Sequence, residues 1–309
     1  MDHSPWIAEP MDGNYNDRDI IMIKSIGDEY KLIKKIGNGS FGEVFLVTCA
    51  DGIQYACKAE SNKSKSRLKN EYHIYKRFAS KKLQCVPKIY RYIETPRYNL
   101  MVMQLLGKSV ETVFDESNGR LDLGTTMRLA VHIISHMEIL HRNGIIHRDI
   151  KPSNFMFGIN EHANDLYCMD FGLSKKWYVD GSHIALRSGR SMIGTARYAS
   201  INIHMGTEPS RRDDMESVGY MLVYLCKGSL PWQGLKKKTN DNPMDRIGEK
   251  KMMVCVKQLC ADLPECFYDY IVCTRNLQFT EKPDYELLRE LFIKSARDKG
   301  IGLRYHWEP

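Results

Sequence analysis

The sequence contains no run of about 18 consecutive apolar residues, the length that a membrane-spanning helix requires. Its opening, Met1-Asp2-His3-Ser4-Pro5, has neither the basic start nor the apolar core of a secretory signal. We therefore expect an intracellular protein, cytoplasmic or nuclear, that does not bind membranes.

Zinc-type cysteine pairs and internal repeats are also missing. Nine cysteines are scattered along the 309 residues, and none has the CxxC spacing of a zinc site. An odd number of dispersed cysteines argues against a disulfide framework, so we expect reduced thiols that mostly fill the core. No repeat occurs at periods of about 20 to 50 residues.

The composition is that of a globular protein with excess positive charge. Forty-five Lys and Arg against 38 Asp and Glu give a net charge of +7, which favours anionic partners such as phosphate ligands, acidic peptides or nucleic acid. The basic residues are dispersed and lack interleaved aromatic residues. Nucleic-acid binding is therefore the less favoured alternative.

The apolar spacing changes from strand-like to helical along the chain, which predicts an α+β fold with two lobes. Strand-like spacing extends from residue 30 to about 104, with turn signals at 51–52 and 95–97, and one amphipathic helix over 66–78 interrupts it. Helical spacing covers 123–140, 215–226, 266–277 and 285–295. We expect an N-terminal extension at 1–28 with a possible strand at 20–23, a β-rich lobe at about 29–106, a helical lobe at about 107–297 and a short tail at 298–309.

A glycine-rich motif follows the first predicted strand. It comprises Gly37, Asn38, Gly39, Ser40, Phe41, Gly42 and, after Glu43, Val44. A dinucleotide-binding fold needs a helix after the third glycine, whereas the alternation over residues 43–47 favours a strand. We therefore predict a hairpin whose backbone can approach phosphate groups.

Lys58 lies in the next predicted strand, and Glu71 lies on the amphipathic helix. Glu71 is the only acidic residue between Glu60 and Glu94. We expect it to pair with Lys58 and hold the ammonium against phosphate oxygens.

Two polar loops carry the remaining candidate chemistry. In His147-Arg148-Asp149-Ile150-Lys151-Pro152-Ser153-Asn154, Asp149 is suited to accept a hydroxyl proton, Lys151 to neutralise a transferring phosphoryl group, and Asn154 to bind a metal ion through its amide oxygen. Asp170-Phe171-Gly172 follows a short predicted strand. Its carboxylate is suited to hold Mg²⁺ between phosphates.

These motifs, in this order, resemble the signature set of the eukaryotic protein kinases over about residues 29–297. The resemblance implies that Lys58 contacts the α- and β-phosphates of ATP, that Asp149 is the catalytic base, and that Asn154 and Asp170 hold Mg²⁺. It also implies that Asp214 anchors the catalytic loop. For the adenine it implies contacts from Ile36, Val44 and Ala56 on one side and Met156 on the other, with Met103 as gatekeeper and Gln104, Leu105 and Leu106 as hinge.

A narrower resemblance, to the casein kinase I family, comes from the second half. The chain has residues 194–202, Gly-Thr-Ala-Arg-Tyr-Ala-Ser-Ile-Asn, where most kinases have Ala-Pro-Glu. Residues 211–220, 228–235, 282–285 and 288–289 resemble the same family. This implies a serine/threonine kinase that is active without phosphorylation of its activation segment.

Casein kinase I enzymes favour an acidic or phosphorylated residue about three positions before the target hydroxyl, so the resemblance also implies a cationic pocket. The candidates are Arg187, Arg190, Arg197, Lys236, Lys237 and Lys238. The lysine triplet departs from the family pattern, whose basic residues continue further along this segment. A pseudokinase scaffold with the same fold is the remaining alternative, although every catalytic position is filled.

Overall fold

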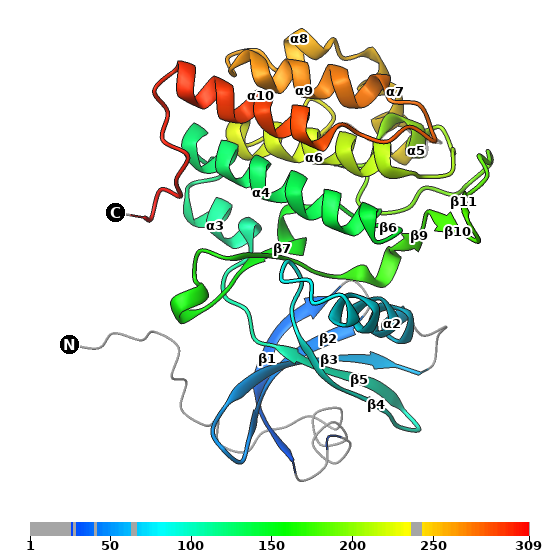
Figure 1. Cartoon of the computed structure of the whole chain (residues 1–309), viewed down its shortest axis with the longest axis vertical. Helices are drawn as coiled ribbons and strands as arrows, with labels where there is room; N and C mark the ends of the chain where they lie inside the picture. The colour runs from blue at the N-terminus through cyan, green and yellow to red at the C-terminus, as the bar shows by residue number, and fades with distance from the viewer. Residues whose placement is uncertain (1–25, 27–28, 40–41, 63–66, 236–242, 309) are drawn as a thin grey trace. The chain divides into compact units, whose positions relative to one another are not determined.

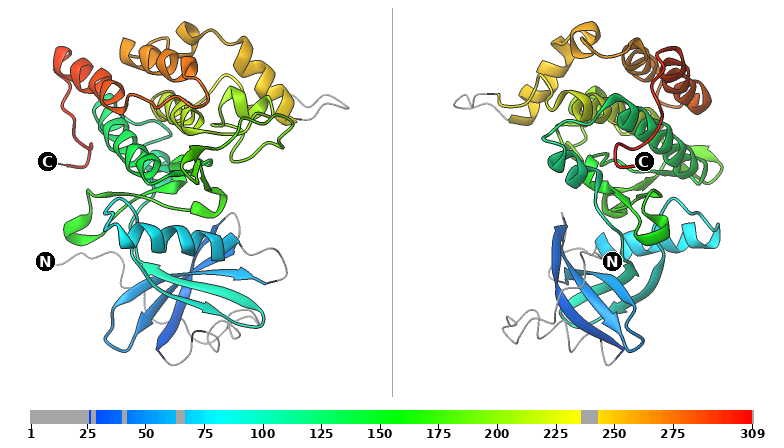
Figure 2. Two further views of the ribbon diagram at one scale, coloured as in Figure 1. Left: turned by 45° about the vertical axis from the view of Figure 1, so that its right-hand side comes forward. Right: turned by 90° about the vertical axis from the view of Figure 1, so that its left-hand side faces the viewer.

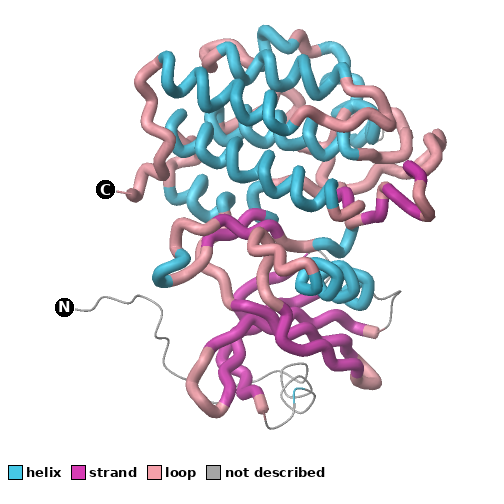
Figure 3. The backbone as a smooth tube through the Cα atoms, in the orientation of Figure 1, coloured by secondary structure: helices cyan, strands magenta, loops and turns pink. Residues whose placement is uncertain are grey.

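The computed structural model describes residues 26, 29–39, 42–62, 67–235 and 243–308. The chain divides into two compact units, residues 1–107 and 108–309. The strand expected at 20–23 lies outside the described residues. Among the described residues, the long strands lie in the first unit and most of the helices in the second, which confirms the predicted α+β class (Figure 3).

Within the described residues, the first unit is built on an antiparallel sheet of five strands in the order β1-β2-β3-β5-β4 (Figure 1). The strands are β1 (Tyr30–Gly39), β2 (Gly42–Cys49), β3 (Gln54–Ser61), β4 (Ile89–Glu94) and β5 (Tyr98–Gln104). The predicted turns at 51–52 and 95–97 are confirmed, since they join β2 to β3 and β4 to β5.

The core of this unit lies on one face of the sheet, because alternate residues of a strand point to the same side. Phe45 and Val47 of β2, Cys57 and Ala59 of β3, and Leu100 and Val102 of β5 form this cluster together with Leu32. Ile26 belongs to it as well and is only 3% exposed. A residue that we placed in the extension therefore packs into the sheet's core.

Helix α2 (Arg67–Ser80) confirms the predicted amphipathic helix and packs against β4 and β5 (Figure 2). Its buried residues Leu68, Glu71, Tyr75 and Phe78 recur every three or four positions, as expected for one helix face. Tyr72 stacks on Tyr92 of β4, with ring centroids 4.6 Å apart. The helix is thereby held in register with the sheet.

The second unit is helical. Its helices are α3 (Val110–Glu116), α4 (Leu123–Arg142), α5 (Ile201–His204), α6 (Arg211–Lys227), α7 (Pro243–Met253), α8 (Val256–Leu259), α9 (Glu265–Asn276) and α10 (Tyr285–Asp298). Helices α4 and α9 each pack against both α6 and α10 (Figure 1). The predicted helices at α4, α6, α9 and α10 are confirmed, whereas α3, α7 and the four-residue helices α5 and α8 were not predicted. Among the described residues, no helix has the length and apolar character needed to cross a membrane.

Short strands and turns connect these helices. The strands are β6 (Ile145–Ile146), β7 (Phe155–Phe157), β8 (Leu166–Cys168), β9 (Lys175–Lys176), β10 (Tyr178–Val179) and β11 (Ser182–His183). β6 pairs with β9, β7 with β8 and β10 with β11, all antiparallel. The loop over residues 147–154 therefore begins at β6 and ends at β7.

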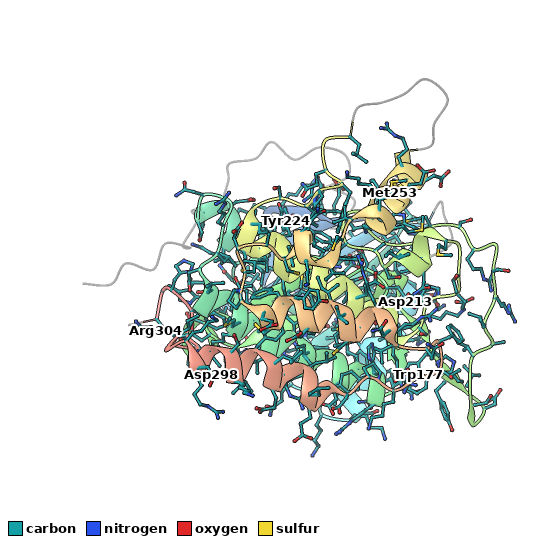
Figure 4. The ribbon with its side chains drawn as sticks, turned by 90° about the horizontal axis from the view of Figure 1, so that it is seen from above. Trp177, Asp213, Tyr224, Met253, Asp298 and Arg304 are labelled. Atoms are coloured by element: carbon teal, nitrogen blue, oxygen red, sulfur yellow. The ribbon has the colours of Figure 1, made fainter. Side chains whose placement is uncertain are left out.

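The segment after α10 packs back on the second unit. Tyr305 is fully buried, its ring stacks on Trp307 at 4.8 Å, and Trp307 meets the ring of Phe157 on β7 edge-on. Glu308 pairs with Arg128 of α4 at 2.6 Å. Figure 4 labels Asp298 and Arg304 at the start of this return. All nine cysteines are free thiols, and Cys57, Cys85, Cys168, Cys260 and Cys266 are buried.

Candidate active site

Lys58 and Glu71 form a buried ion pair in the first unit. Lys58 lies on β3 and Glu71 on α2, with Nζ and Oε2 2.7 Å apart, and the two side chains are 8% and 2% exposed. An ammonium group at such a depth is costly unless a carboxylate accompanies it. The pairing is the one that we expected from the sequence.

Glu60 binds the start of the helix that carries Glu71. Its two carboxylate oxygens accept hydrogen bonds from the backbone N–H groups of Arg67 and Leu68, at 3.0 and 3.1 Å. Such groups at a helix start have no partner within the helix, and a negative charge there is favoured by the helix dipole. The strand that carries Lys58 therefore also positions the helix. We assigned Glu60 no role, although its place two residues after Lys58 was an available signal.

The glycine-rich segment joins β1 and β2 as the predicted hairpin. Gly37 pairs with Val44 and Gly39 with Gly42 in antiparallel register. A Cβ atom at Gly42 would lie 2.1 Å from the carbonyl oxygen of Ala59, so this position has no room for a side chain. Ser40 and Phe41, at the tip, lie outside the described residues.

The candidate adenine-binding residues of this unit share the sheet face that carries Lys58. Val44 lies opposite Lys58, and Ala56 lies opposite Met103, so their side chains point to the same side. Ala56 and Met103 are buried, and Ile36 is exposed. The core cluster occupies the other face, which leaves this face for α2 and the candidate site.

Gln104 ends β5 and is tied to the neighbouring loop. Its backbone N–H donates to the carbonyl oxygen of Lys88 at 2.8 Å, and its side-chain oxygen accepts from the Lys88 N–H at 3.2 Å. Leu105 and Leu106 follow it, the first partly exposed and the second buried. Of the three residues expected as the hinge, Gln104 therefore already uses its backbone N–H in a hydrogen bond to Lys88.

In the second unit, Asp214 of α6 organises the loop over residues 147–154. Its carboxylate accepts hydrogen bonds from the backbone N–H groups of His147 and Arg148, at 2.7 and 2.8 Å. It also contacts Nε2 of His141 at 2.9 Å. Burial would raise the pKa of Asp214, but the bonds to His141 and the Arg148 N–H outweigh it and hold this pKa below its ordinary value. An ionised carboxylate therefore holds the start of the loop.

His147 connects this loop to the segment before Asp170. Its Nδ1 accepts from the Asp149 N–H at 3.3 Å, and its Nε2 lies 3.0 Å from the carbonyl oxygen of Met169. The first contact leaves Nε2 as the ring nitrogen that donates. The histidine thus fixes Asp149 and the residue before Asp170 at once.

Asp149 has a partner for each of its carboxylate oxygens. The hydroxyl of Thr195 donates to Oδ1 at 2.7 Å, and Nζ of Lys151 lies 2.9 Å from Oδ2. The amide of Asn154 donates to the Asp149 backbone oxygen at 2.8 Å. Asp149 is only 4% exposed, so these contacts fix its orientation. We had assigned Thr195 no role, and no local pattern connects it with a residue 46 positions earlier.

Asn154 and Asp170 lie at the adjoining ends of two paired strands. Asn154 precedes β7, Asp170 follows β8, and the Met169 N–H donates to the Asn154 carbonyl at 2.9 Å. Because Nδ2 of Asn154 is directed at Asp149, its Oδ1 is the atom that can bind a cation. Asp170 adopts a left-handed conformation, with φ of 63°. One amide oxygen and one carboxylate are ligands suited to Mg²⁺.

Met156 stands at the centre of β7 in the same hairpin. It pairs with Tyr167 of β8 and is partly exposed. Only one residue, Phe155, separates it from Asn154. The second unit therefore presents the expected adenine contact from the strand that directly follows the candidate metal ligand Asn154.

Glu208 binds one cation of β9 and one of the segment between β9 and α5. Its carboxylate lies 2.6 Å from Nζ of Lys175 and 2.9 Å from Nη2 of Arg190, and its side chain is 3% exposed. Burial would raise the pKa of Glu208, but the bonds from Lys175 and Arg190 hold it below its ordinary value. Arg190, which we expected to bind substrate anions, is thus engaged within the chain.

The other candidate anion-binding residues differ in their surroundings. Arg197 is partly exposed, and its guanidinium lies 5.1 Å from the ring centroid of Tyr224 and 5.7 Å from that of Tyr198. Burial would lower the pKa of Arg197, but the bond to the Tyr198 hydroxyl and nearby groups raise it. Arg187 is exposed. Lys236, Lys237 and Lys238 lie outside the described residues.

Comparison with known protein families agrees with these arrangements. Residues 30–290 match the family described as the protein kinase domain. The match begins at β1, includes both candidate loops and ends within α10. This chain, with its strand-built first unit and helical second unit, belongs to the protein kinase family.

Proposed function

We propose that the protein is a serine/threonine kinase of casein kinase I type. It transfers the γ-phosphoryl group of MgATP to serine or threonine residues of acidic or already phosphorylated proteins. The kinase domain occupies about residues 29–297. The observation that carries this proposal is the catalytic loop, in which a buried Asp149 is oriented by Lys151 and Thr195.

In this proposal Asp149 accepts the proton of the attacking substrate hydroxyl. A base must lie within hydrogen-bonding reach of that proton and must keep one orientation. The contacts of Asp149 with Thr195 and Lys151 fix this orientation. Lys151, 2.9 Å from Asp149, neutralises the negative charge that develops on the phosphoryl group during transfer. Asp214 acts indirectly, because it holds the backbone just before Asp149.

ATP and Mg²⁺ are the cofactors that these residues suit. Lys58, held by Glu71, binds the α- and β-phosphates, and the hairpin from Gly37 to Gly42 contributes backbone amides. Leu105 and Leu106 offer backbone groups to the adenine, since the Gln104 N–H is already bonded to Lys88. Asn154 and Asp170 hold Mg²⁺, which neutralises phosphate charge when bound.

For the anionic substrate residue we propose Arg197 as the principal contact. Its guanidinium lies beside Tyr198 and Tyr224, which restrain it without neutralising its charge. A guanidinium can bind a phosphate through two hydrogen bonds. Arg187 and the lysines at 236–238 add positive charge, while Arg190 must first leave Glu208.

A phosphate-transfer assay with casein and purified protein tests the proposed activity. The wild type should transfer phosphate only with MgATP, and D149N should lower turnover by about three orders of magnitude or more with little change in Tm, because the effect lies in the transition state. D115N, on the helix α3, controls for the loss of one carboxylate. Substantial turnover by folded D149N would refute the assignment, and an inactive wild type that binds MgATP would favour the scaffold alternative.

Two peptides test the proposed substrate class. One carries phosphoserine three residues before the target serine, and the other is its unphosphorylated twin. The phosphorylated peptide should react faster, with a gain that shrinks as salt rises. R197A should lose most of this preference, and equal rates for both peptides in the wild type would exclude an anion pocket.

A further inference from the structure

Lys251 is a buried cation in contact with the chain segment that joins Thr195 to α5. It lies near the end of α7 and has 0% exposure. Its ammonium donates to the carbonyl oxygen of Ala196 at 2.8 Å and also to that of Ala199. Three consecutive charged residues, Glu249-Lys250-Lys251, are typical of a solvent-exposed segment. The structure nevertheless places Lys251 in the interior.

The surroundings of this ammonium are polar backbone and aromatic faces. Nζ lies 5.0 Å from the ring centroids of both Tyr220 and Trp232. Carbonyl oxygens and ring faces both attract a cation, although neither carries a full negative charge. Among the described residues, Lys251 forms no ion pair with a carboxylate. The carbonyl groups of Ala196 and Ala199 are therefore its strongest partners.

The segment that Lys251 binds, residues 195–199, is a tight turn with Arg197 at its middle. The N–H groups of Tyr198 and Ala199 both donate to the Thr195 carbonyl, at 2.9 and 3.0 Å. From outside the turn, Nε1 of Trp232 donates to the Arg197 carbonyl at 2.7 Å. Lys251 and Trp232 together thus bind the carbonyl oxygens of residues 196, 197 and 199.

The two ends of this turn lead to the candidate site. Its first residue, Thr195, donates to Asp149, and its middle residue, Arg197, directs its guanidinium toward Tyr224. Tyr224 lies toward the C-terminal end of α6, and Figure 4 shows it at the other end of that helix from Asp213. A shift of the turn would therefore move the proposed anion contact and the partner of the catalytic base together.

We propose that Lys251 is a positioning residue that holds the turn 195–199 in shape and so sets where Arg197 meets an acidic or phosphorylated substrate residue. This inference rests on the proposed function, which supplies the substrate class. Lys251 itself touches no reacting atom. It acts through the backbone carbonyls of Ala196 and Ala199.

Protonation of Lys251 adds a pH dependence. Burial lowers its pKa to about 7, with Glu216 of α6 opposing this shift and Arg275 of α9 adding to it. His204 of α5 and the hydroxyl of Tyr220 are the other titratable groups nearby. As the pH rises through about 7, the ammonium becomes a neutral amine whose hydrogen bonds are weaker. We therefore expect the hydrogen bonds from Lys251 to the turn 195–199 to weaken.

Peptide binding, followed by fluorescence anisotropy without ATP, tests the proposal independently of catalysis. The probes are a labelled peptide with phosphoserine three residues before a serine and its unphosphorylated twin. K251M keeps an unbranched side chain of nearly the same length and removes its charge, and K250M, at the exposed neighbour, is the matched control. We expect K251M to reduce the preference for the phosphorylated peptide by about tenfold, equivalent to about 1.4 kcal/mol, while K250M binds like the wild type.

A folded K251M with the wild-type preference would overturn the proposal. If K251M does not fold, the test uses the wild type and a third peptide, which is rich in aspartate and glutamate. The carboxylates of this peptide stay ionised from pH 6 to 9, and its Kd is measured across this range. Its Kd should rise as the pH increases through about 7, and an unchanged Kd would overturn the proposal. Failure of phosphate transfer with intact peptide preference would refute the proposed kinase activity alone.

Discussion

Oε2 of Glu60 accepts a hydrogen bond at 3.1 Å from the backbone N–H of Leu68, across a segment that joins a strand to a helix. Together with the bond from Arg67, this contact places the start of α2 against the strand that bears Lys58. The ion pair between Lys58 and Glu71 therefore depends on a third residue, Glu60, which positions the helix that carries Glu71.

The variant E60A tests this dependence. Removal of a carboxylate that accepts two backbone hydrogen bonds should cost about 1.5–3 kcal/mol of stability. If Glu60 acts through Glu71, the double variant E60A/E71Q should lose no more activity than E71Q alone, because coupled residues are not additive. E43Q, on the neighbouring strand, is the control. Fully additive losses in kcat would show that Glu60 does not act through Glu71, and an unchanged kcat in E60A would show that it serves stability only.

Gly194 offers a test of backbone geometry near the catalytic loop. Its φ is +81°, and a Cβ atom there would lie 2.3 Å from the carbonyl oxygen of Arg148. G194A should therefore lose more than the roughly 1–2 kcal/mol expected for a left-handed alanine alone, and should also lose activity. G189A is the matched control, since Gly189 has φ of +70° with open space around it. Equal Tm values for the two variants would contradict the predicted clash.

Glu208 supplies an internal negative charge to the activation segment. In the E208Q variant, Lys175 and Arg190 lose their carboxylate, and we expect a loss of about 1–3 kcal/mol together with a lower initial rate. The measurement uses phosphatase-treated enzyme, verified by intact mass, and E161Q, at an exposed acid, as the control. A wild-type enzyme that loses most of its rate on phosphatase treatment would show that the pairs of Glu208 with Lys175 and Arg190 are not enough to keep the segment active.

His204 predicts how stability responds to acid. Burial, and then the nearby Lys251, lower the pKa of His204 from its ordinary value of 6.5 to about 4. Between pH 6.5 and 4 the unfolded chain binds a proton that the folded chain does not, so stability falls with pH across this window. Denaturant titrations should show a shallower fall for H204Q than for the wild type, with H73Q, on the solvent side of α2, as control. Parallel curves for H204Q and the wild type would contradict the shift.

The sequence predicted the groups that lie within continuous motifs. Asp149, Lys151 and Asn154 stand in one loop, and the strands and long helices repeat at regular periods, so local spacing was enough to find them. Local spacing did not predict the contacts between residues that are distant in the sequence. Glu60, Thr195, Glu208 and Lys251 each look like ordinary polar residues until the fold brings their partners close.

The missed helices have a physical explanation too. Helix α3 spans only seven residues, too few for a clear apolar period. Helix α7 begins with proline, contains Gly248 and is rich in charged residues, so its apolar pattern is weak. What holds it is the contact of Lys251 and Gly248 with the segment 196–204, which no local signal reports.

The return of residues 301–308 to the second unit has a consequence for the order of folding. Phe157 lies on the strand that begins after Asn154, and it packs against Tyr305 and Trp307, almost 150 residues later. During synthesis, the hairpin that bears Asn154 and Asp170 emerges long before these rings are available to cover it. The packing of the hairpin that bears Asn154 and Asp170 is therefore completed only after residue 307 has been synthesised.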